Sequence, residues 1–153
     1  MKIIKNISFF IVMSLVMTLL ANFLESTFLY KYLKENIIGL LLTLLAINTA
    51  TLGLIASKIQ DIIVQFPNFN FSSTIKEMKL SLLEQIILIS IGVVNLTVQS
   101  SGKIIFEGKE SVCNVILVSI LIYSINILWD TGNAVFVVIE ELQKMRKNEE
   151  KED

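Results

Sequence analysis

The sequence predicts an all-α fold: an integral membrane four-helix bundle in which helices 2, 3 and 4 extend into the cytoplasm. Hydrophobic residues make up 54% of the 153 residues and charged residues only 18%, whereas soluble domains average about 45–50% and about 25%. The apolar residues also gather in four uncharged runs, each about long enough to cross a bilayer core. We expect one bundle over residues 1–147 and a charged, solvated tail at 148–153.

The first run, residues 7–24, follows Lys2 and Lys5 and has two interpretations. A charged start and an apolar middle are typical of a signal peptide as well as of a first span. Ala21 is the only small residue near a plausible cleavage point, and Leu19 precedes it where a second small residue is usual. We therefore expect an uncleaved transmembrane helix.

The second run, residues 37–57, contains no charge and is the clearest span. Asn36 comes directly before it and is a suitable N-cap, because its side chain can accept hydrogen bonds from the first free amides. Apolar residues continue at helical spacing over 58–66, so we expect the helix to project into the cytoplasm until Pro67 ends it.

Thr74 and Glu77 have the spacing of a capping box, which predicts that the third helix begins near residue 75. Residues 75–85 alternate apolar and charged positions and form a second cytoplasmic extension. The span itself is expected at 86–102, where Gly102 is a natural stop.

The fourth span is expected at 112–130, with Trp129 at its end where interfacial aromatics are favoured. Amphipathic spacing resumes over 131–147 and predicts a third cytoplasmic extension. Lys58, Glu84 and Asp130 would then mark one cytoplasmic boundary, and Asp130 would be able to pair with Lys58.

The distribution of basic residues predicts the orientation. With four spans, nine of the thirteen Lys and Arg residues fall on the side of both termini. The positive-inside rule then places the N and C termini in the cytoplasm. Heavy use of Lys, twelve to one over Arg, together with Ile, Asn and Phe indicates an AT-rich bacterial genome, so the expected location is the bacterial inner membrane.

Composition argues against several functional classes. The chain has no histidine and one cysteine, Cys113, so the usual general base and paired-cysteine metal sites are missing. No phosphate-binding loop or nucleophile motif is present, and a net charge of −1 gives no field for nucleic acid. We expect neither an enzyme nor a cofactor, a metal or a nucleic-acid partner.

Polar residues within the spans have two interpretations. Asn48, Asn95 and Asn126 either hold helices together or line a polar pathway, and the first use is the commoner one. Asp130 is interfacial if the fourth span ends at Trp129, and it becomes a buried proton or cation site if the membrane reaches further.

Two further groups of residues are candidates for contacts. One face of the second helix has small side chains that permit close helix packing, within the chain or with another subunit: Ala46, Thr49, Ala50, Gly53 and Ser57. The cytoplasmic extensions carry apolar residues that either pack together or dock a soluble partner. The docking candidates are Ile63, Phe66, Phe69, Phe71 and Phe136.

Three functions follow as hypotheses. The first is a small oligomeric membrane subunit that anchors, or transmits a signal to, a cytoplasmic protein; the others are a small ion channel or transporter subunit and a membrane immunity protein that neutralises a toxin. In length, span number, short outer loops and cytoplasmic helices the chain resembles membrane subunits of bacterial anti-phage systems, of which the membrane component of Kiwa is one example. That resemblance carries over no functional residue, but it favours the first hypothesis and antiviral defence.

Overall fold

The computed structural model describes residues 12–20, 23–65 and 71–149, and every element in those ranges is α-helical. A short helix covers residues 12–20. Three long helices follow: α2 (Phe28–Gln65), α3 (Ser72–Ser100) and α4 (Lys109–Glu149). Each of the three contains a segment long and apolar enough to cross a membrane.

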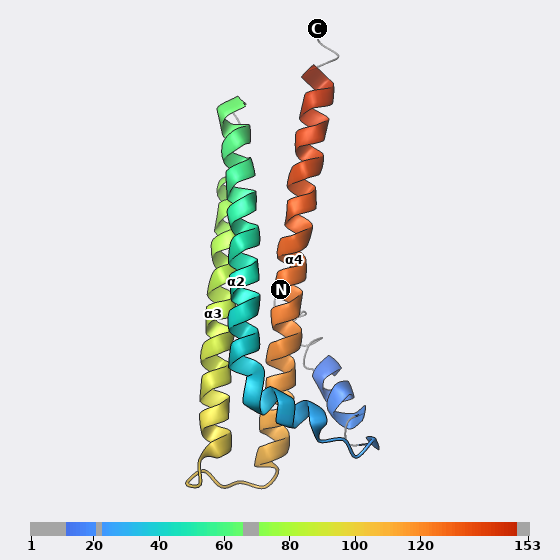
Figure 1. The fold of residues 1–153 in the computed structure, drawn as a ribbon, viewed down its shortest axis with the longest axis vertical. Helices are drawn as coiled ribbons and strands as arrows, with labels where there is room; N and C mark the ends of the chain where they lie inside the picture. The colour runs from blue at the N-terminus through green and yellow to red at the C-terminus, as the bar shows by residue number, and fades with distance from the viewer. Residues whose placement is uncertain (1–11, 21–22, 66–70, 150–153) are drawn as a thin grey trace.

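The three long helices lie side by side and alternate in direction, as Figure 1 shows. The start of α2 bends away from the rest of that helix at the end of the bundle that holds the α3–α4 connection. The helix at 12–20 lies beside this bent part and α4. Two hydrogen bonds hold it there: Ser119 Oγ donates to Ser14 Oγ at 2.8 Å, and Tyr30 Oη donates to the Thr18 carbonyl at 3.2 Å.

The fold of the predicted first span is described only in part. Nine helical residues rise about 14 Å, half of a bilayer core, so the described helix alone does not cross it. Residues 7–11 and 21–22 of the predicted span lie outside the described residues. Three candidate spans are therefore observed among the described helices, and the fourth stays a prediction.

Apolar contacts join α2 to both of its neighbours in two clusters. The cluster nearer the bent start of α2 includes Leu33, Ile37 and Leu41 of α2 with Leu117 of α4, all at most 2% exposed. The second includes Leu52, Ile55 and Ile59, packed against partly buried residues of α3 and α4. These α2 residues recur at intervals of three and four, so one stripe of the helix forms the core.

Two predicted helix starts are wrong. Asn36 lies inside α2, which begins eight residues earlier, and its Nδ2 donates to the Tyr32 carbonyl at 2.9 Å instead of capping a helix. The helix α3 begins at Ser72 after Phe71, and no side chain caps it, so Thr74 and Glu77 fall within its first turns. In both cases the helix begins before the residue that was expected to cap it.

The helix ends agree better with the sequence. The described part of α2 reaches Gln65, and residues 66–70, which include Pro67, lie outside the described residues. The helix α3 ends at Ser100, just before Gly102. Gly108 has a φ of +78°, a conformation that favours glycine, and it directly precedes α4. Lys109 Nζ then donates to the carbonyls of Ser101 at 2.6 Å and Ile104 at 3.0 Å, which ties the connection to both helices.

Candidate functional site

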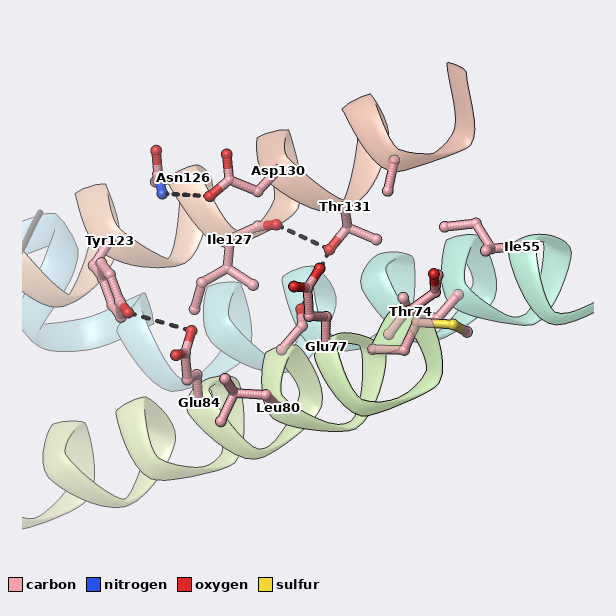
Figure 2. Close-up of a pocket in the computed structure, with 14 residues that line it drawn as sticks. Ile55, Thr74, Glu77, Leu80, Glu84, Tyr123, Asn126, Ile127, Asp130 and Thr131 are labelled. Atoms are coloured by element: carbon pink, nitrogen blue, oxygen red, sulfur yellow. Dashed lines mark hydrogen bonds between the residues drawn. The ribbon is translucent and has the colours of Figure 1, made fainter. Parts of the chain in front are cut away.

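A cleft of about 410 Å³ lies between α3 and α4, with α2 at its back (Figure 2). We call it the α3–α4 cleft. It is lined by Leu52, Ile55, Thr74, Glu77, Met78, Leu80, Ser81, Glu84, Tyr123, Asn126, Ile127, Asp130, Thr131 and Ala134. Three of these residues are acidic and none is basic, so the cleft favours cations.

The two inner carboxylates each accept a hydrogen bond from α4. Tyr123 Oη donates to Glu84 Oε2 at 3.2 Å, across from one helix to the other. Asn126 Nδ2 donates to Asp130 Oδ2 at 3.0 Å, one turn apart on α4. Figure 2 shows both pairs along the cleft. These bonds orient the carboxylates without neutralising them, because both donors are uncharged.

A chain of polar side chains leads from the cleft toward α2. Thr131 Oγ1 and Ser81 Oγ are 3.2 Å apart, and Asn48 Nδ2 donates to Ser81 Oγ at 3.0 Å. The same Nδ2 donates to Gln85 Oε1 at 3.1 Å. Asn48 and Gln85 are 0% and 2% exposed, so these contacts lie in the core of the bundle.

The Asn48 contacts also set the height of the cleft relative to α2. Asn48 lies nine residues before Ser57, the last of the uncharged residues 36–57, a rise of about 14 Å and close to half a bilayer core. Ser81 and Glu84 of α3 therefore lie level with the middle of this run. The uncharged residues of α3, by contrast, end at Glu84 in the cleft, whereas α4 continues beyond Asp130 with the uncharged residues 131–139.

The predicted common boundary of Lys58, Glu84 and Asp130 is wrong for this reason. Lys58 lies ten residues beyond Asn48, about 15 Å along α2 from the level of Glu84. Lys58 Nζ pairs instead with Asp61 Oδ2 at 3.1 Å, an exposed pair within α2 that contributes little. Asp130 itself lies within the continuous helix α4, is exposed, and bonds to Asn126.

The three predicted asparagines differ in their surroundings. Asn95 Nδ2 donates to the Cys113 carbonyl at 3.0 Å, so Asn95 joins α3 to α4, as Asn48 joins α2 to α3. Only Asn126 lines the α3–α4 cleft. Cys113 is a buried free thiol.

The small-residue face of α2 has no neighbour in the described part of the chain. Ala46, Thr49, Ala50, Gly53 and Ser57 are all exposed, and a Cβ added at Gly53 would meet nothing within 4 Å. Within the chain, α2 packs through its larger apolar residues instead. Packing of the small face against another subunit stays a prediction.

The docking candidates differ in how exposed they are. Ile63 is 40% exposed and Phe136 is 65% exposed. Phe71 packs against the Leu52 cluster, so it belongs partly to the core. Phe66 and Phe69 lie outside the described residues.

Sequence reasoning missed the partners of the cleft. Glu84, Tyr123, Ser81 and Thr131 were not singled out as site residues, because hydropathy shows which segments are apolar but not which helices are neighbours. The one available signal was a carboxylate or hydroxyl every three to four residues in α3, at Glu77, Ser81 and Glu84.

Comparison with known proteins suggests no function for this chain, so its function is inferred from the geometry of the site. No protein-family model matches the chain, and searches of curated proteins and of solved structures give no match.

Proposed function

We propose that this chain is a small bacterial oligomeric membrane subunit that anchors, or transmits a signal to, a cytoplasmic protein, with antiviral defence as its setting. One observation carries the proposal: large apolar side chains are exposed on α2 beyond the Lys58–Asp61 pair and on α4 beyond Asp130. Val64 is 76% exposed, Phe136 is 65% exposed and Val137 is 59% exposed. Apolar surface exposed to water is typical of a protein-binding site.

On α2, Val64 falls beyond the lipid in the proposed arrangement. The side chains of Lys58 and Asp61 are 57% and 58% exposed, and charged groups are costly in the bilayer core, so the membrane ends before them on α2. Val64 follows both. On α4, Phe136 and Val137 come after Asp130. The positive-inside rule assigns this end of the bundle to the cytoplasm.

Copurification tests the proposal. The tagged full chain would be purified in mild detergent from its native host, and the mass of the intact complex measured. We expect a soluble protein in fixed ratio to the chain. Phe136→Ser and Val64→Ser should lower the recovered partner at least tenfold, because each removes exposed apolar contact area.

Ile105→Ser is the matched control, since Ile105 is 87% exposed but lies in the connection at the opposite end of the bundle. It should keep the partner. A homo-oligomer alone in the wild type, or an equal loss of partner in Ile105→Ser, contradicts docking at the α2 and α4 ends.

A small ion channel or transporter subunit is the second candidate, and the α3–α4 cleft favours it. Acidic residues at membrane depth commonly mark cation pathways. Asn126→Ala in proteoliposomes should then change cation flux and leave assembly intact. Equal flux in wild type, Asn126→Ala and protein-free vesicles contradicts conduction.

A further inference from the structure

One side of α4 is apolar over several turns but changes from buried to exposed along its length. Val118, Ile125 and Trp129 lie on this side, because residues seven and eleven positions apart on an α-helix are within about 20° of each other around its axis. Val118 is 2% exposed, whereas Ile125 is 51% exposed and Trp129 is 67% exposed. Within the described residues, this side of α4 is therefore open beyond Val118.

The short helix at 12–20 packs against α4 where this open stretch begins. Ser119 Oγ donates to Ser14 Oγ at 2.8 Å, and Ser14 is fully buried, so the two helices approach closely at this point. Figure 1 shows that they run in opposite directions: the short helix ends toward the start of α2 and begins toward the middle of α4. A helix continued backward from Val12 would therefore follow the open stretch of α4.

The depth of the short helix favours such a continuation. Ser119 lies near the middle of the uncharged residues 111–129 of α4, so its contact with Ser14 places the start of the short helix at membrane depth. The first four N–H groups of a helix have no partner within the helix, and unpaired N–H groups are costly in lipid. Continuing the helix through the preceding residues supplies the missing carbonyl partners and moves the free end toward the membrane surface.

The preceding residues also have the required pattern, although residues 3–11 themselves lie outside the described residues. Ile3, Ile7 and Phe10 precede Ser14 at intervals of four, three and four, which places them on the Ser14 face of a continued helix. Lys5 falls on the opposite face, where its long side chain can reach the lipid headgroups. Residues 3–20 in one helix rise about 27 Å, close to the thickness of a bilayer core.

We propose that residues 3–11 continue the short helix and that their Ile3, Ile7 and Phe10 face packs onto α4, covering the open stretch at Ile125 and Trp129. The Ser14–Ser119 contact sets the register. Seven residues back from Ser14 and seven residues forward from Ser119 are both a rise of about 10 Å in the same direction, so Ile7 lies opposite Asn126.

The occupant of this face is thus the chain's own N-terminal segment, in continuity with a contact that the structure already contains. The Ile3 end of the segment reaches the level of Asp130. Phe136, six residues further along α4, lies beyond the covered stretch. Docking of a soluble partner at Phe136 and packing of the segment can therefore fail independently.

Disulfide crosslinking in membranes that contain the full chain tests the face and the register. Cys113→Ala first removes the native thiol, and copper phenanthroline then oxidises pairs of introduced cysteines. Two cysteines join readily only when their Cα atoms are about 4.4–6.8 Å apart. Mass spectrometry of the digested protein measures the yield, and circular dichroism checks that each variant is folded.

Three pairs are compared. Ser14→Cys/Ser119→Cys reports the contact in the structure and should crosslink. Ile7→Cys/Asn126→Cys should crosslink to a similar extent. Lys5→Cys/Asn126→Cys is the matched control: it is at nearly the same level but on the opposite face of the segment, so its yield should be at least about fivefold lower.

Equal yields from the Ile7 and Lys5 pairs overturn the proposal, and so does a failure of the Ser14→Cys/Ser119→Cys pair, which sets the register. A second experiment identifies whose segment is bound. Two differently tagged chains, one with Ile7→Cys and one with Asn126→Cys, would be expressed together, and we expect no crosslink between them. A crosslink between the two chains as strong as that within one chain shows that a second copy covers this face, which also overturns the proposal.

Discussion

Replacing Asn48 by leucine should weaken the contact between α2 and α3 by a measurable amount. Asn48 is 0% exposed and donates to Ser81 Oγ and Gln85 Oε1. Hydrogen bonds between membrane helices contribute about 0.6 kcal/mol each on average. Loss of both gives about 1.2 kcal/mol, and Gln85, left buried with no partner on either amide atom, adds about 1 kcal/mol or more.

A double variant separates the loss of the hydrogen bonds from the cost of the buried Gln85 amide left without a partner. The double variant Asn48→Leu/Gln85→Leu removes both amides, so no buried polar group is left behind at this contact. Replacing both partners by apolar groups of similar shape is often nearly neutral. We expect the double variant to be at least as stable as Asn48→Leu alone, with a coupling energy of about 1 kcal/mol or more between the two sites.

Reversible unfolding by sodium dodecyl sulfate in mixed micelles, followed by far-ultraviolet circular dichroism, measures these free energies. Thr49→Val is the matched control, because Thr49 is exposed and its Oγ1 bonds only within α2, to the Leu45 carbonyl at 2.8 Å. It should change the free energy of unfolding by less than about 0.5 kcal/mol. A harmless Asn48→Leu, or strictly additive effects in the double variant, would refute the reasoning.

Five other substitutions test the packing and the connection. Gly92→Ala should be tolerated, because the added Cβ would lie 3.5 Å from Leu41 Cδ1, an ordinary contact, whereas Gly92→Leu should cost about 1–3 kcal/mol by overpacking in the same unfolding assay. Gly108→Ala should cost about 1 kcal/mol because of its positive φ, and Gly102→Ala, in open space, should cost less. Lys109→Met should speed amide hydrogen exchange in residues 101–108, since it removes two hydrogen bonds to that segment; unchanged exchange would show that the connection holds without them.

The helices themselves were largely predictable, because long uncharged runs force the backbone to satisfy its own hydrogen bonds in lipid. Gly102 likewise predicted an end of α3 close to the one observed. The starts of α2 and α3 were not predictable in the same way. Asn36 and Thr74 are good caps in isolation, but a cap is used only where the helical pattern begins.

The cleft was beyond the reach of hydropathy. Asp130 was recognised as a carboxylate of uncertain depth, but its depth depends on which α2 residue lies opposite. The Asn48–Ser81–Gln85 contact supplies that information, and it arises from tertiary packing that no single-helix pattern encodes. Asn48 and Asn95 illustrate the same limit: both were recognised as polar residues within spans, but not which helix each would contact.

The vertical offset between α2 and α3 has a consequence for the surrounding lipid. The uncharged residues of α2 reach about 15 Å further toward the Lys58 end than those of α3, which end at Glu84. A bilayer of uniform thickness matches only one side, so the bundle must tilt or the membrane must thin beside the cleft. Lipid deformation costs free energy around each copy. Copies that share one deformed region lower the total free-energy cost. Hydrophobic mismatch therefore supplies a force for clustering that acts before any side chain of one copy contacts another.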